Sequence, residues 1–228
     1  AMESRVYLYM GEWSKSYEAS ERVLAGKSTL VNLNDEGGKL PNEFTSIEMI
    51  TAYEVFPNSD YAGPLLLYPS FLQEYEEGKD LRPNKYYKVN QNGNYTSSKS
   101  GESKFKCTFR TGELYLNSAE AAAHLNKLPE ARTRLLKLIE NRYTSEGYEQ
   151  KKNEINAMSQ EKLITEILKE RARELAFEGH RWFDLRRTTR PEIKKVIEDV
   201  TYTLVQDDSR YTLRIPQDAI DANPGLLN

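Results

Sequence analysis

Hydrophobic residues recur at the spacing of an amphipathic helix near the start of the chain and again over a long stretch of its second half. In residues 3–26 two apolar faces are separated by Gly11, which predicts a helical hairpin. Residues 113–187 carry three more apolar faces, and Pro129 lies just inside the start of the second, where its missing N–H does no harm. The third face runs over about 160–187. We therefore expect a mainly helical protein.

The end of the chain predicts a change from helix to strand. Pro191 is placed to open a shorter helix that ends at about Asp199. Beyond it, hydrophobic and polar residues alternate in 201–205 and again in 211–215, on either side of a polar turn. This alternation predicts a β-hairpin, followed by a tail, over residues 200–228.

Residues 27–112 lack the helical period and are rich in turn-forming and aromatic residues. They hold 12 of the 21 Gly and Pro residues and seven tyrosines. Short alternating runs at 47–50, 86–89 and 105–109 predict β-strands, and a short helix is expected over about 70–77. This zone is therefore expected to be a loop-rich insertion with short β-hairpins.

The helices before and after the insertion share features of a tetratricopeptide pair, in which small residues let two antiparallel helices approach closely. Ala119 and Ala131 are twelve residues apart on facing helices, although Ser16 stands where alanine is usual in the first pair. A generic helical hairpin remains an alternative. The expected fold is mainly α, a tetratricopeptide-like α-α superhelix with a loop-rich insertion. The four zones, 3–26, 27–112, 113–199 and 200–228, are expected to form one domain over residues 1–228.

Composition and charge exclude several classes of function. The chain has 228 residues and a net charge of −3. It therefore lacks the excess of positive charge that is typical of nucleic-acid-binding proteins. The single cysteine, Cys107, excludes an internal disulfide and a site of several thiolates. The first residues carry no secretion signal, and helical spacing begins at once. We therefore expect residue 1 to lie inside a longer chain.

Residues 170–187 form the densest cluster of charges. On a helix, opposite charges three or four residues apart pair, so the segment predicts a structural ion-pair network. Its expected members are Glu170, Arg173, Glu174, Glu178, Arg181 and Asp184. A catalytic or metal site of Glu178, His180 and Asp184 is less favoured, because Glu178 lies well round the helix from His180. We expect no catalytic residues, no metal site and no cofactor, while a hydrolase using Glu178 and Asp184 remains a hypothesis to test.

The tyrosines of the insertion are the better candidates for a binding site. Tyrosine offers a flat apolar face and a hydroxyl, which suits stacking against a sugar ring. Nearby amide and carboxylate groups supply further hydrogen bonds. The ligand-binding candidates are Tyr53, Asn58, Asp60, Tyr61 and Tyr68. Most of the seven tyrosines are expected to pack the insertion onto the helices, and two or three to reach a ligand.

Several blocks of sequence, in order, resemble one known family. The 170–187 segment, ERARELAFEGHRWFDLRR, is similar to the C-terminal signature of the SusD/RagB family of nutrient-binding outer-membrane lipoproteins. The other similar blocks are Met10–Trp13, Asp80–Arg82, Phe109–Ala121, and Ile215–Gln217 followed by Asn223–Gly225. Family members are roughly twice as long, so the resemblance places this chain in their C-terminal half.

The resemblance implies a function without catalysis. It implies binding of an oligosaccharide at the cell surface, and delivery of it to a SusC-like TonB-dependent transporter in the outer membrane. The lipid anchor of the family would belong to a part of the protein outside this chain. Two alternatives stay open: a RagB-like member that binds peptide, and a helical-repeat scaffold that binds a protein and no small ligand. The family's binding residues vary, so none is transferred individually.

Overall fold

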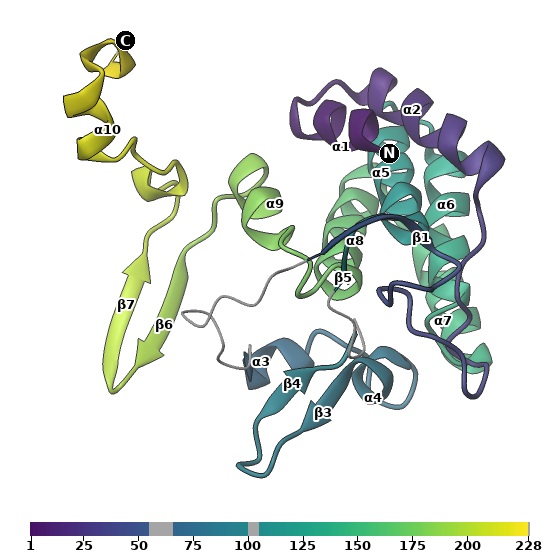
Figure 1. Cartoon of the computed structure of the whole chain (residues 1–228). Helices are drawn as coiled ribbons and strands as arrows, with labels where there is room; N and C mark the ends of the chain where they lie inside the picture. Colours follow the sequence, from purple (N-terminus) through teal and green to yellow (C-terminus); the bar gives the residue numbers. More distant parts are fainter. Residues whose placement is uncertain (55–65, 100–104, 228) are drawn as a thin grey trace. The chain divides into compact units, whose positions relative to one another are not determined.

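The computed structural model describes residues 1–54, 66–99 and 105–227 (Figure 1). The chain divides into two compact units, Ala1–His180 and Arg181–Asn228, and each is described by itself. The single domain expected over 1–228 stays a prediction. Among the described residues, no helix is long and apolar enough to cross a membrane.

Unit 1 is built from helices that follow one another in the chain and pack side by side (Figure 1). They are α1 (Met2–Tyr9), α2 (Trp13–Gly26), α5 (Thr111–His124), α6 (Leu128–Glu140), α7 (Ser145–Asn156) and α8 (Gln160–Glu174). Helix α5 lies against α2, α6 and α8, and is buried along nearly its whole length. The prediction of a mainly α fold is confirmed.

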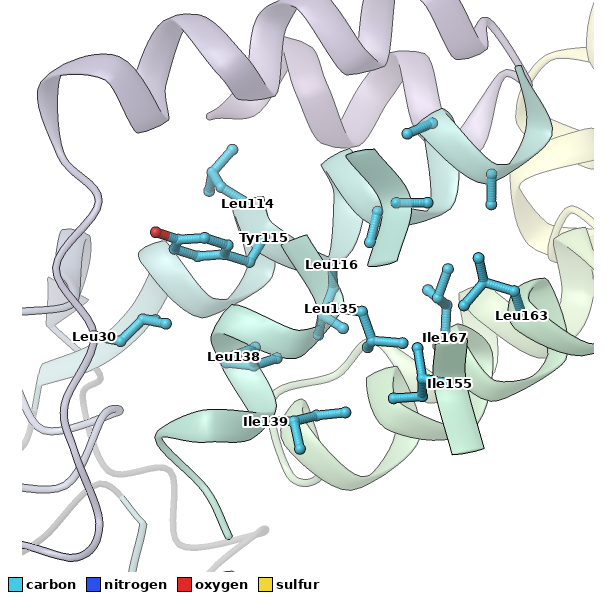
Figure 2. Packing of buried hydrophobic residues seen from close by; sticks show 14 of the residues in the cluster. Leu30, Leu114, Tyr115, Leu116, Leu135, Leu138, Ile139, Ile155, Leu163 and Ile167 are labelled. Carbon is cyan, nitrogen blue, oxygen red and sulfur yellow. The ribbon is translucent and has the colours of Figure 1, made fainter. Parts of the chain in front are cut away.

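The core of unit 1 depends on alanines in α5 and α6. Ala119, Ala122 and Ala123 in α5 and Ala131 in α6 have no exposed surface. Because alanine adds so little volume, the two helix backbones can approach closely, and larger side chains fill the space around them. Figure 2 shows these larger residues, which include Leu114, Leu116, Leu135, Leu138, Ile139, Ile155, Leu163 and Ile167.

Helix α7 is an element that the hydrophobic pattern did not predict. It buries only Gly147, Lys151 and Ile155, so its apolar face is too short to give a helical period. Its start is set instead by Thr144, whose hydroxyl oxygen accepts a hydrogen bond from the Gly147 N–H. A Cβ at Gly147 would lie 2.7 Å from the Cβ of Lys79, so this position requires glycine.

The insertion folds into two small antiparallel sheets. Strand β1 (Met49–Glu54) pairs with β5 (Phe105–Arg110), and β2 (Leu66–Leu67), β4 (Tyr95–Ser97) and β3 (Tyr87–Val89) form a second sheet in that order. The strands expected near 86–89 and 105–109 are confirmed, whereas β1 begins at Met49 and shares only residues 49–50 with the strand expected at 47–50. Two short helices, α3 (Pro69–Leu72) and α4 (Arg82–Tyr86), accompany the second sheet, and α3 is shorter than the helix expected over 70–77.

The long helix expected over 160–187 is interrupted. Helix α8 ends at Glu174, and Phe177 and Gly179 both have positive φ, at 65° and 82°. Buried cations hold this end: the Lys99 ammonium donates to the carbonyls of Glu174 and Ala176 at 2.7 and 3.0 Å. Cationic side chains commonly satisfy the last carbonyls of a helix in this way.

Unit 2 contains a hairpin, but not at the predicted place. It begins with α9 (Arg181–Arg187) and continues with β6 (Ile193–Ile197) and β7 (Val200–Leu204). The prediction of a helix over 191–199 is therefore wrong. Glu198 and Asp199 have φ of 49° and 65°, as the two central residues of a tight hairpin turn require. The β-branched residues of 193–201 pair across that turn instead of forming a helical face.

The second half of the predicted hairpin, residues 211–215, is also not a strand. Tyr211 ends a 3₁₀ turn (Ser209–Tyr211), and its hydroxyl donates to the Pro191 carbonyl at 2.5 Å. Its ring stacks on Trp182, with 5.0 Å between ring centroids. These contacts bury the tyrosine and take the chain away from β7. The unit closes with α10 (Gln217–Ala222) and a last 3₁₀ turn (Pro224–Leu227).

Candidate functional site

The structure describes two of the five predicted ligand-binding residues, and both are exposed. Tyr53, in β1, and Tyr68, just before α3, expose 56% and 51% of their surface. Asn58, Asp60 and Tyr61 lie outside the described residues, so the structure does not show whether the five come together.

Other tyrosines of the insertion are buried and hold it in place. Tyr75, Tyr86 and Tyr87 expose 5% of their surface or less. The Tyr75 hydroxyl lies 2.7 Å from that of Tyr87 and donates to the Arg173 carbonyl at 2.9 Å, which ties the β2-β4-β3 sheet to α8. Burial raises the pKa of Tyr87 to about 12, so the hydroxyl keeps its proton at neutral pH.

A buried ionic cluster joins the insertion to α8, with Glu174 at its centre. The carboxylate of Glu174 accepts from Arg110 at 2.6 Å, from Arg142 at 2.9 Å and from Arg82 at 3.2 Å. Burial alone would raise the pKa of Glu174, but the arginines outweigh it and hold the pKa well below its ordinary value. Glu174 is therefore a fixed anion.

Arg82 extends the cluster to the start of α4. It donates to Asp80 at 2.7 Å and to Glu170 at 2.6 Å. Glu170 also accepts from Arg173 at 2.9 Å. Arg82 donates two parallel hydrogen bonds to the Glu170 carboxylate and also binds both oxygens of Asp80. Such forked bonds fix the orientation of these side chains as well as pairing their charges.

Glu178 occupies the other end of the cluster. It accepts from the Lys99 ammonium at 2.6 Å and from Arg110 at 2.8 and 2.9 Å. Burial would raise the pKa of Glu178, but Arg110 and Lys99 lower it to about 2. A carboxylate held ionised by two cations is poorly suited to act as a general acid or base near neutral pH.

The cluster is balanced in charge and closed to water. Its side chains, all with 5% exposure or less, are Arg82, Lys99, Arg110, Arg142, Arg173, Glu48, Asp80, Glu170, Glu174 and Glu178. Among these ten side chains five are cations and five are anions, and Arg173 also pairs with Glu166 at 2.7 Å at the edge of the group. The buried charges therefore pair with one another and fix how the insertion packs on α8.

The predicted network is thus partly assembled. Glu170, Arg173, Glu174 and Glu178 lie in the ionic cluster, whereas Arg181 is exposed and Asp184 pairs with Arg187 at 2.7 Å within unit 2. The other six members come from segments at 48, 80–82, 99, 110 and 142, which residues 170–187 alone could not indicate. Among the described residues, no group of His, Cys, Asp or Glu is arranged to hold a metal ion.

Packed helices and an aromatic insertion that buried ion pairs anchor to α8 together define a mainly helical protein. A sequence model of the SusD family matches residues 74–228. The chain therefore belongs to the SusD family.

Solved structures of the same superfamily resemble the chain over nearly its whole length. One from Bacteroides thetaiotaomicron has a TM-score of 0.74 at 26% identity, covering 97% of this chain and 57% of the other. One from Bacteroides fragilis has 0.73 at 22%, covering 97% and 54%. A protein from Bacteroides vulgatus described as SusD-like and carbohydrate-binding has 0.68 at 22%, covering 97% and 56%. The chain thus spans little more than half the length of these relatives. No curated protein matches it.

Proposed function

We propose that this protein binds an oligosaccharide without changing it chemically, through exposed aromatic residues of the insertion. Membership of the SusD family carries the proposal. It is supported by the similar fold of a Bacteroides vulgatus protein described as carbohydrate-binding. Tyr53 and Tyr68, both more than half exposed, provide the flat faces, and Asn58, Asp60 and Tyr61 of the same segment provide hydrogen bonds.

The buried carboxylates support binding without catalysis. Glycoside hydrolysis needs two carboxyl groups on either side of the scissile bond, one of them a proton donor. Glu174 and Glu178 are instead enclosed by arginine and lysine side chains and have lowered pKa values. Hydrolysis of any bound sugar by the purified chain would contradict this part of the proposal.

The proposal extends to a partner and a location. As in the family it resembles, the whole protein would be lipid-anchored at the cell surface and deliver its ligand to a SusC-like TonB-dependent transporter in the outer membrane. The packed helical pairs, α1 with α2 and α5 with α6, would suit protein docking if they follow the tetratricopeptide plan expected from the sequence. Copurification with a SusC-like transporter from the same organism tests this step.

Titration calorimetry against panels of oligosaccharides and peptides tests ligand binding. The double variant Tyr53→Ala, Tyr68→Ala is expected to bind the best sugar about tenfold more weakly, or worse, because both stacking faces are lost. Tyr202→Ala, which removes a tyrosine 57% exposed in unit 2, is the matched control and should bind normally. Binding of peptides alone would favour a RagB-like role. If no sugar or peptide binds or raises the melting temperature, the protein is a scaffold.

A further inference from the structure

A concave surface, called the cleft below, lies in unit 1 beside α3, α4 and β4. It has a volume of about 690 Å³, within the range of about 300–1,000 Å³ typical of ligand sites. Its lining includes Gln73, Glu77, Asn84 and Tyr95. Gln73 and Glu77 lie in the turns between α3 and α4, Asn84 lies in α4 and Tyr95 in β4. Figure 1 shows α3 next to β4 and α4 next to β3. Neither Tyr53 nor Tyr68 lines this cleft.

Part of the cleft wall is rigid. Tyr75 lines it, and its hydroxyl is fixed by the Tyr87 hydroxyl and the Arg173 carbonyl. Asp80 also lines it, and both of its oxygens accept from Arg82 within the ionic cluster. Because these groups are already ordered, a ligand need not order them, which lowers the entropic cost of binding.

Three exposed polar side chains that line the cleft make no hydrogen bond or ion pair with the described residues. They are Gln73, Glu77 and Asn84. The two amides can each donate and accept, as a sugar hydroxyl can. Tyr95 is half-buried, packs against the hydrophobic cluster of the insertion and lines the cleft, where it adds aromatic surface that suits a sugar ring.

The charges of the cleft select among ligands. No basic side chain lines it, in the part of the chain that the structure describes. Asp80 is neutralised by Arg82, so Glu77 contributes the one uncompensated charge among the described lining residues. A ligand carrying carboxylates or phosphates would be repelled by Glu77 and would find no cation to pair with, whereas a neutral polyhydroxyl ligand meets no such penalty.

We propose that this cleft is a second binding site for a neutral saccharide, held by the amides of Gln73 and Asn84 and by the ring of Tyr95. The inference rests on the proposed function and adds to it. The cleft does not include Tyr53 or Tyr68, so it would be a separate sugar site. It would also prefer neutral sugars over acidic ones.

Calorimetry on the 228-residue chain tests this site with oligosaccharides of glucose, mannose and galactose and with an acidic oligosaccharide of galacturonic acid. The double variant Gln73→Ala, Asn84→Ala is expected to weaken one of two binding steps for a neutral sugar about tenfold, equivalent to about 1.4 kcal/mol, and to leave unchanged the step that Tyr53→Ala, Tyr68→Ala weakens. Both side chains are exposed and without partners among the described residues, so the variant should keep the melting temperature of the parent. Asn92→Ala, an exposed asparagine in the β3–β4 turn, is the control and should bind normally.

The outcomes separate this inference from the proposed function. If the Tyr53→Ala, Tyr68→Ala variant loses binding while Gln73→Ala, Asn84→Ala binds like the parent, the second site is refuted and the proposed function stands. Preferential binding of the galacturonic acid oligomer refutes the neutral-ligand assignment. If no sugar binds the parent chain, both proposals fail. Side-chain amide NMR signals of Gln73 and Asn84 should shift with the bound sugar while that of Asn92 stays, and unchanged signals would overturn the site.

Discussion

Replacing Glu178 by glutamine tests whether the ionic cluster stabilises unit 1. The substitution keeps the shape of the side chain and removes its charge. The Lys99 ammonium, 2.6 Å away, loses its carboxylate partner. Arg110 loses one of its three carboxylate partners, because it also pairs with Glu48 and Glu174. We expect a large loss of stability and a correctly folded protein at moderate temperature.

Two independent estimates agree on the size of the effect. The pKa of Glu178 falls from its ordinary value of 4.5 to about 2, and each unit is worth about 1.4 kcal/mol, which gives about 3 kcal/mol. Removing one partner from a buried ion pair costs about 3–5 kcal/mol in other proteins. Glutamine retains an oxygen that accepts one hydrogen bond, so the lower end, about 3 kcal/mol, is expected.

Urea unfolding followed by tryptophan fluorescence measures the loss. The chain has two tryptophans, Trp13 in unit 1 and Trp182 in unit 2. In a Trp182→Phe background the signal comes from Trp13 alone and therefore reports the unit that contains Glu178.

Glu140→Gln is a matched control, because it makes the same chemical change in an ion pair on the surface. Glu140 pairs with Lys137 at 2.8 Å on the surface of α6, and its side chain is 47% exposed. Glu140→Gln should cost less than about 0.5 kcal/mol. If Glu178→Gln costs no more than Glu140→Gln, the cluster does not stabilise unit 1, and our account of residues 170–178 is wrong.

Three further outcomes follow from the packing and the charges. A Cβ at Gly112 would lie 2.5 Å from a guanidinium nitrogen of Arg110, so Gly112→Ala should lower the unfolding free energy by about 1–3 kcal/mol; an unchanged urea midpoint would contradict this. His124 stacks on Trp13 at 3.9 Å, so His124→Ala should cost about 1 kcal/mol and alter Trp13 emission. In the unfolded chain Glu178 takes up its proton near pH 4.5, and in the folded chain near pH 2, so its stabilisation is complete above about pH 5 and is lost as the pH falls towards 2. Urea midpoints that do not change over this range would exclude that role.

Helices with a repeating apolar face were predictable from the sequence. Helices α2 and α6 show the helical period because one side of each is buried, whereas α5 is buried on all sides and reads as a run of apolar and small residues. Helix α7 gave no such signal, since its burial falls on a glycine and a lysine as much as on Ile155. The pattern therefore reports which side chains are apolar, and only indirectly which backbone is helical.

The tail was mispredicted because two readings of the same residues compete. Lys194, Lys195, Glu198 and Asp199 alternate with aliphatic residues in a way that suits a helix as well as a hairpin. Strand pairing wins, and the two acidic residues adopt the turn. The cross-strand partners that decide the outcome contribute nothing to the period of either segment alone.

Most of the ionic cluster could not be predicted at all. Arg82 reaches Glu170 across 88 residues of sequence, and Arg142 reaches Glu174 across 32. No local pattern connects such residues, because their contact depends on how the insertion folds back on α8. The exposed or buried state of each tyrosine depends on the same event, so local sequence alone does not determine which tyrosines are exposed.

The late position of Glu174 in unit 1 sets an order for folding during synthesis. Arg82, Arg110 and Arg142 leave the ribosome first, and their shared carboxylate follows 92, 64 and 32 residues later. Asp80 and Glu48 precede α8 and pair with the same arginines, but two carboxylates leave three buried guanidinium groups with an uncompensated charge, which costs several kcal/mol. We therefore expect the insertion to close onto the helices only after α8 has been made.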